Sequence, residues 1–143
     1  MKPVLLDNNV LSELWKPAPD PNVLAWFDQD ELEWFLPSPV IAEIQEGAEA
    51  TPNARRRAEI NARLDAFLRD YGALVLDWDA ETARTWARLK HSPEVKRSPQ
   101  PLWDSLIDAM AVRYNALVAT RNTDDFRHAE TVNPWDFKPT SPA

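Results

Sequence analysis

The stretch "PVLLDNNVLSEL", residues 3–14, is a short apolar run that stops on one aspartate and two asparagines. Its apolar residues Val4, Leu5 and Leu6 are consecutive, which is typical of a strand covered on both faces of a parallel sheet. In open parallel sheets, ligands bind beyond the carboxyl ends of the strands. Asp7 therefore has two interpretations. It is a functional group at the edge of a sheet, or it caps a helix that begins near residue 8.

Similar short apolar runs recur along the chain. They occupy residues 34–36, 73–76, 117–119 and, more weakly, 131–132. Between them, apolar residues at helical spacing predict helices within residues 40–48, 60–68, 82–89 and 103–114. This alternation predicts an α/β domain with a central parallel sheet. The segment "SPEVKRSPQP", residues 92–101, is predicted as an exposed loop, and residues 138–143 as a disordered tail.

The composition limits the functions that the chain can have. Its 143 residues suit a single domain, and 44% hydrophobic residues can bury a sizeable core. The absence of Cys excludes disulfides and thiolate sites, and two His leave little for a zinc site. The net charge of −7 argues against a broad basic surface for nucleic acid, so any nucleic acid must be bound locally. Without a membrane-spanning run or a signal-like leader, we expect a cytoplasmic protein.

Besides Asp7, acidic side chains lie after predicted strands or at the start of a predicted helix at three further places in the sequence. Glu43 lies on the helix after the second strand, Asp104 begins the helix of residues 103–114, and "TRNTDDF", residues 120–126, follows the fourth strand. Each has an ordinary interpretation as a solvated helix residue, a helix cap or a plain loop. Together they predict one pocket of oxygen ligands, which favours Mg²⁺ or Mn²⁺ over zinc.

Asp108 shares a helical stripe with Asp104, because the two are four residues apart. Two like charges beside apolar residues repel each other and lose hydration, and a cation would relieve both costs. The alternative is that Asp104 caps the helix and Asp108 points to water.

Four motifs together resemble a known family. "LLDNNVLSEL", residues 5–14, resembles the opening "LLDTNVLSEL" of PIN-domain ribonucleases, specifically the VapC toxins of type II toxin–antitoxin systems. "AEIQEG", residues 42–47, is similar to the second acidic motif of that family, and "PLWDSLIDAMA", residues 101–111, to its "DALIAATA" helix. "ATRNTDDF", residues 119–126, with "NPW", residues 133–135, is similar to its closing segment. The motifs stand in the order and spacing of the family over nearly the whole chain.

The resemblance implies a three-layer α/β/α fold with a central parallel sheet of four or five strands, in a PIN-like nuclease domain of residues 1–137. It implies Mg²⁺-dependent hydrolysis of RNA phosphodiester bonds, with Mn²⁺ as a possible substitute. It also implies a homodimer that is inhibited by a cognate VapB-type antitoxin.

Residue by residue, the resemblance assigns catalytic roles to Asp7, Glu43 and Asp104, with Asp125 as the fourth acid. Asp7 and Asp104 would bind the metal, and the further candidates for ligands are Glu43, Asn122, Asp125 and Asp108. Whether Asn122, Asp124 or Asp125 is the fourth ligand stays open. Candidates for substrate positioning are Asn8, Asn9, Thr120 and Arg121. The chain departs from the family at Asn8, where Thr is usual, and at Asp108, where Ala is common.

Two other interpretations remain. A non-catalytic protein of the same fold would bind a partner through its acidic pocket, and Asn122 in place of an acid permits this. A haloacid-dehalogenase-type phosphatase would need an Asp where the chain has Asn9. Cations that would hold flanking RNA phosphates are Arg55, Arg56, Arg57, Lys96 and Arg97, although solvated surface pairs are their ordinary interpretation.

Overall fold

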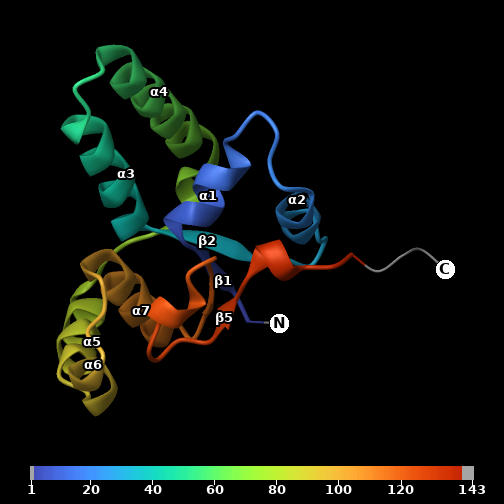
Figure 1. Ribbon diagram of the computed structural model, residues 1–143. Helices are drawn as coiled ribbons and strands as arrows, with labels where there is room; N and C mark the ends of the chain where they lie inside the picture. Colours follow the sequence, from blue (N-terminus) through green and yellow to red (C-terminus); the bar gives the residue numbers. More distant parts are fainter. Residues whose placement is uncertain (1, 140–143) are drawn as a thin grey trace.

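Figure 1 shows the computed structural model, in which the structure describes residues 2–139. Five parallel strands form one sheet in the order β3-β2-β1-β4-β5. The strands are β1 (Val4–Leu6), β2 (Trp34–Pro37), β3 (Val75–Leu76), β4 (Leu117–Ala119) and β5 (Thr131–Val132). Val4 pairs with Trp34 on one side and with Leu117 on the other, so β1 is the central strand. The predicted parallel sheet is confirmed.

Helices cover both faces of this sheet and produce the expected three layers (Figure 1). In the figure, α1 and α2 lie on one side of the sheet, whereas α5, α6 and α7 lie on the other. The helices are α1 (Asn8–Leu14), α2 (Pro21–Phe27), α3 (Ser38–Ala50), α4 (Ala54–Tyr71), α5 (Ala80–Lys90), α6 (Pro93–Arg97) and α7 (Leu102–Tyr114). Short 3-10 turns are η1 (Gly72–Leu74), η2 (Thr123–Asp125) and η3 (Pro134–Asp136). The helices α3 and α4 form a hairpin that extends away from the sheet.

The core explains why the first strand is continuously apolar. Leu5 and Leu6 are fully buried, because α1 and α7 cover β1 from opposite faces. Ile107 and Met110 of α7 are also fully buried. Because β1 is buried on both faces, a polar side chain can reach an opening only where the strand ends, at its carboxyl end.

Local signals set several helix boundaries. The Asp79 carboxylate accepts hydrogen bonds from the backbone N–H and the hydroxyl of Thr82, each at 2.7 Å, and so caps α5. Asn115 ends α7 in the left-handed region at φ 52°. The backbone N–H of Ala116 then donates to the Ala111 carbonyl at 2.9 Å, which is the bond of a Schellman cap. This turn sends the chain directly into β4.

Three details differ from the predictions. The segment predicted as an exposed loop, residues 92–101, contains α6, which Ser92 caps and whose Val95 is buried. Helix α2 is not among the predicted helices, although Asp20 and Pro21 are a clear start signal for it. Of the apolar run 73–76, only Val75 and Leu76 form a strand.

The predicted disordered tail, residues 138–143, lies mostly outside the described residues, since residues 140–143 are not described. Within residues 2–139, no helix has the length and apolar character needed to cross a membrane.

Candidate active site

Asp7 stands at the carboxyl end of β1 and caps α1, so its interpretation as a helix cap is confirmed and its position at the edge of the sheet is the expected one. Its carboxylate is 3% exposed. Oδ1 accepts a hydrogen bond from the backbone N–H of Asn8 at 2.8 Å, and Oδ2 accepts one from the Thr120 hydroxyl at 2.7 Å. Burial raises the pKa of Asp7, the bonds from Thr120 and Asn8 lower it, and the charge of Asp125 raises it. The two donors thus partly offset the cost of a buried carboxylate.

Thr120 and Asn9 tie the ends of β1 and β4 together. The Asn9 amide nitrogen donates to the Thr120 hydroxyl oxygen at 3.2 Å and lies 3.4 Å from Asp7 Oδ2. The Asn9 amide oxygen accepts the backbone N–H of Arg121 at 3.2 Å. These two candidates for substrate positioning therefore act on the orientation of Asp7. The Arg121 guanidinium stacks over the Trp135 ring, 5.0 Å from its centroid.

Three more carboxylates surround Asp7. Glu43 lies on α3, directly after β2, and burial raises its pKa, as does the charge of Asp7, while a hydrogen bond with Asn8 lowers it. Asp104 lies in the first turn of α7. Burial, followed by the charges of Asp7, Asp125 and Glu43, raises the pKa of Asp104 to about 7. Negative charge from four separate segments is therefore concentrated at one place.

The turn after β4 presents Asp125 to this cluster. Asp125 ends the 3-10 turn η2, its charge acts on both Asp7 and Asp104, and its carboxylate shares a hydrogen bond with Asp104. The side chains of Asn122 and Asp124 are exposed. The sequence left the fourth ligand open among Asn122, Asp124 and Asp125. The geometry favours Asp125.

Asp108 has a different environment from the one expected. It is 1% exposed, and its Oδ1 accepts the backbone N–H of Ala129 at 2.9 Å. Its Oδ2 lies 3.1 Å from His128 Nδ1 and 3.3 Å from the amide nitrogen of Gln100. The buried carboxylate is thus satisfied by donors of the protein. It neither points to solvent nor depends on a cation shared with Asp104. The geometry favours a supporting role for Asp108 over metal ligation.

Gln100 and His128 complete this support, and sequence reasoning missed both. The Gln100 amide nitrogen also donates to the backbone carbonyl of Asp125 at 2.9 Å. Asp108, Gln100 and His128 therefore connect α7 to the turn that carries Asp125. No motif marks either missed residue. The only signal was the buried position of Asp108 itself, which required partners from somewhere in the chain.

One comparison decides the family, because the family model of the PIN domain matches residues 4–131. The chain belongs to the PIN domain family. Among curated relatives, the VapC ribonuclease Y4jK of Sinorhizobium fredii is 36% identical over 93% of this chain and 98% of its own length. Toxin FitB of Neisseria gonorrhoeae is 30% identical over 92% of this chain and 98% of its own. The resemblance of the four motifs to VapC toxins is thus confirmed.

Solved structures agree with the fold of this PIN domain. The crystal structure of FitAcB from Neisseria gonorrhoeae superposes with a TM-score of 0.77 at 28% identity, over 94% of this chain and 99% of that one. DNA-bound VapBC from Salmonella typhimurium, at 19% identity and a TM-score of 0.74, covers 94% of this chain and 99% of its own and supports the fold alone.

The donor set of this PIN domain fits a hard divalent cation. Within residues 2–139, no group of three or more acidic, His or Cys side chains is placed so that it could hold a metal ion. Mg²⁺ does not need such a group, since it commonly binds through one or two carboxylates and keeps several waters. The like charges that raise the pKa of Asp104 are the repulsion that a divalent cation would relieve.

A groove beside the cluster is lined by one of the three consecutive arginines that the sequence suggested for RNA, Arg55, Arg56 and Arg57. It runs between α1, α3 and α4, has a volume of about 550 Å³, and is lined by Asn8 and Glu43 together with Arg56. Arg57 instead donates to the carbonyls of Ala48 and Thr51, and Arg55 pairs with Glu59. Only Arg56 of the three lines this opening.

Proposed function

We propose that this PIN-domain protein is the toxin of a type II toxin–antitoxin system and hydrolyses RNA phosphodiester bonds as a metal-dependent endoribonuclease. The observation that carries the proposal is the convergence of Asp7, Glu43, Asp104 and Asp125 at the carboxyl edge of the sheet, where burial and the charges of the other three acids raise the pKa of Asp104 to about 7. The homology to a VapC ribonuclease over nearly the whole chain supports the same activity.

Each acid has a distinct part in the proposed reaction. Asp7 and Asp104 would hold Mg²⁺ or Mn²⁺, with Glu43 and Asp125 as further ligands. The bound ion supplies charge that offsets the scissile phosphate and lowers the pKa of an attacking water. Burial raises the pKa of Asp7, and the hydrogen bonds from Thr120 and Asn8 oppose this shift because they stabilise the charged form. Glu43, whose pKa burial raises, is suited to accept the proton of the water.

The second group of residues fixes the geometry of the first. Asn9 and Thr120 orient Asp7, and Asp108 with Gln100 holds the turn of Asp125 against α7. Well-fixed carboxylates matter because displacement of a ligand by about 1 Å typically costs orders of magnitude in rate. The resemblance to VapC ribonucleases implies products with 5′-phosphate and 3′-hydroxyl ends.

The partners belong to the same proposal. Solved relatives include toxin–antitoxin complexes such as VapBC from Rickettsia felis, bound to a DNA fragment from its promoter. We infer a VapB-type antitoxin for this chain, a homodimer in its absence, and action in the cytoplasm, where the RNA substrate is. Light scattering of the purified chain alone and with its antitoxin would measure both assemblies.

Cleavage of RNA tests the enzyme directly. Antitoxin-free protein is incubated with total cellular RNA in Mg²⁺, in Mn²⁺ and in EDTA. We expect metal-dependent cuts that disappear in Asp7→Asn and in Asp104→Asn. Glu46→Gln is the matched control, because Glu46 is an exposed acid on α3 and is not among the charges that shift the pKa of Asp7, Glu43 or Asp104. A folded wild type that cuts nothing with either metal would contradict the proposal and favour a binding protein of the same fold, as would an Asp7→Asn variant that cuts normally.

A further inference from the structure

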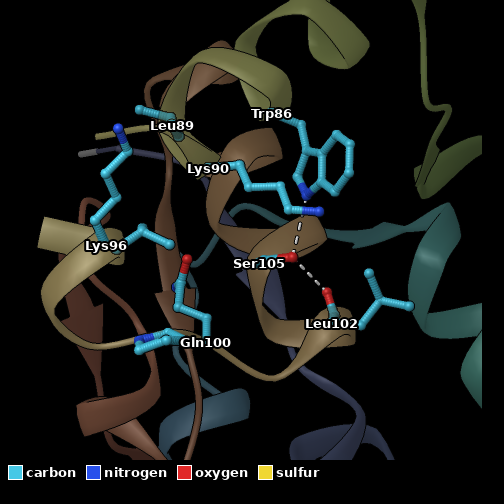
Figure 2. Close-up of a pocket in the computed structure, with 9 residues that line it drawn as sticks. Trp86, Leu89, Lys90, Lys96, Gln100, Leu102 and Ser105 are labelled. Carbon is cyan, nitrogen blue, oxygen red and sulfur yellow. Dashed lines mark hydrogen bonds between the residues drawn. The ribbon is translucent and has the colours of Figure 1, made fainter. Parts of the chain in front are cut away.

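A second cavity lies on the other side of α7 from the sheet, and the proposed reaction does not use it. It is formed by α5, α6 and the first turn of α7, and its volume is about 390 Å³. Figure 2 shows Trp86 and Lys90 on α5, Lys96 on α6, and Gln100 and Ser105 around this space. This volume is at the small end of the range for ligand pockets, which suits a single compact group.

The walls combine an aromatic face with positive charge. The only charged residues that line the cavity are Lys90 and Lys96, although the chain carries a net charge of −7. The indole N–H of Trp86 donates to the Ser105 hydroxyl at 3.1 Å, which fixes the ring against α7 (Figure 2). The Lys90 ammonium lies over that ring, 4.9 Å from its centroid. Lys90 is exposed, and a cation–π contact at an exposed site is weak, so this ammonium can leave the ring face.

The cavity is joined to the acidic cluster through two residues. Ser105, which holds Trp86, directly follows Asp104 in α7. Gln100, which lines the cavity, donates its amide to the backbone carbonyl of Asp125 at 2.9 Å. The groove with Arg56 opens at Glu43, in contrast, on the α3 side of the same cluster. A strand of RNA that crosses the cluster would therefore meet positive charge on both sides.

We propose that this cavity binds one nucleotide of single-stranded RNA next to the scissile phosphate, with its base on Trp86 and its phosphate between Lys90 and Lys96. Proteins that bind single strands combine aromatic stacking faces with cations that follow the backbone. The amide oxygen of Gln100 supplies a polar group at the rim, whereas its amide nitrogen and the Ser105 hydroxyl are engaged in hydrogen bonds within the protein. The inference rests on the proposed ribonuclease activity and extends it to how the enzyme selects its cleavage site.

Neutralising the two lysines tests the phosphate contacts. The substrate is a short single-stranded RNA that the wild type cuts once. In Lys90→Gln/Lys96→Gln, we expect KM to rise roughly tenfold with kcat nearly unchanged. The slope of log affinity against log salt should become shallower by about 0.7, because the two lysines hold one phosphate and each phosphate contact on a single strand contributes about 0.7. The matched control is Arg84→Gln/Arg88→Gln, which removes two exposed charges from α5 outside the cavity.

An abasic scan tests the base. One base at a time is removed from the same RNA, and the wild type should lose roughly tenfold in affinity at one position beside the cut, because base–aromatic stacking is lost there. In Trp86→Leu, removal of the base at that position should weaken binding no more than removal of a base elsewhere in the RNA. A melting curve of Trp86→Leu checks the fold, and the lysine variants test the phosphate contacts of the same site with Trp86 in place.

The outcomes separate this inference from the function on which it rests. A wild type that neither binds nor cuts RNA overturns both. If the wild type cuts RNA but the lysine variants keep its KM and salt slope, only the nucleotide site is overturned. The same holds if the Arg84→Gln/Arg88→Gln control changes KM and salt slope as much as the lysine variants do. If the lysine variants change the dimer or antitoxin binding while RNA cleavage is unaffected, the cavity is a protein contact and the inference is wrong.

Discussion

Replacing Asp104 by Asn should stabilise the metal-free protein while it abolishes cleavage. The pKa of Asp104 rises from 3.8 to about 7 because of burial and the charges of Asp7, Asp125 and Glu43. Ionised Asp104 is therefore unfavourable in the folded state. A carboxyl with a raised pKa in the folded protein contributes stability at low pH that is lost as pH rises through the folded pKa. For Asp104 this window extends from about pH 4 to about pH 7.

The magnitude follows from the shift. A shift of about three pKa units corresponds to about 4 kcal/mol at 1.36 kcal/mol per unit. Because the carboxyl is only partly buried, solvent screening reduces this to about 1–2 kcal/mol. Asp104→Asn should then melt about 3–6 °C higher than the wild type in EDTA at pH 8. At pH 4 most of the difference should vanish, because the carboxyl is then protonated in the folded wild type and, with a pKa of 3.8, partly protonated in the unfolded chain.

Thermal melting with and without metal provides the assay. Mg²⁺ should raise the melting temperature of the wild type at pH 8 and leave Asp104→Asn nearly unchanged, because the variant has lost a ligand. Glu46→Gln controls for the loss of one negative charge elsewhere on the surface. An Asp104→Asn variant that melts below the wild type at pH 8 in EDTA, or a difference independent of pH, would show that no excess negative charge accumulates at this cluster.

Further predictions concern the residues around the cluster. Thr120→Val removes the bond that lowers the pKa of Asp7, so the acid limb of the pH–rate profile should move to higher pH; an unchanged profile would exclude that role. Asp108→Ala leaves the N–H of Ala129 unpaired, and urea unfolding should show a loss of about 1–3 kcal/mol. Asn115 has φ 52°, so Asn115→Ala should cost about 1 kcal/mol in the same assay, whereas Asn115→Gly should not; equal effects would contradict the backbone explanation.

The fold was largely predictable because its signals are local. The run Val4–Leu6 is continuously apolar, and such a run indicates a strand buried on both faces wherever its neighbours lie. Helical periodicity identified α3, α4, α5 and α7 for the same reason. Residues 92–101 were misjudged because proline and charge dominate their composition. One buried side chain, Val95, is enough to anchor the short helix α6.

The acidic cluster was predictable as a set of residues, since motifs in a known order and spacing carried it. The sequence thus determined the alternation of five strands with the four longer predicted helices, and through the motifs it assigned Asp7, Glu43 and Asp104, with the fourth ligand open among Asn122, Asp124 and Asp125. The central position of β1 came only from the strand pairing. The roles of their neighbours depend on contacts between residues far apart in the chain. Thr120 reaches Asp7 across 113 residues, and Gln100 and Ala129 meet on Asp108. Periodicity records which face of an element is apolar, whereas only tertiary packing decides which donor satisfies a buried carboxylate.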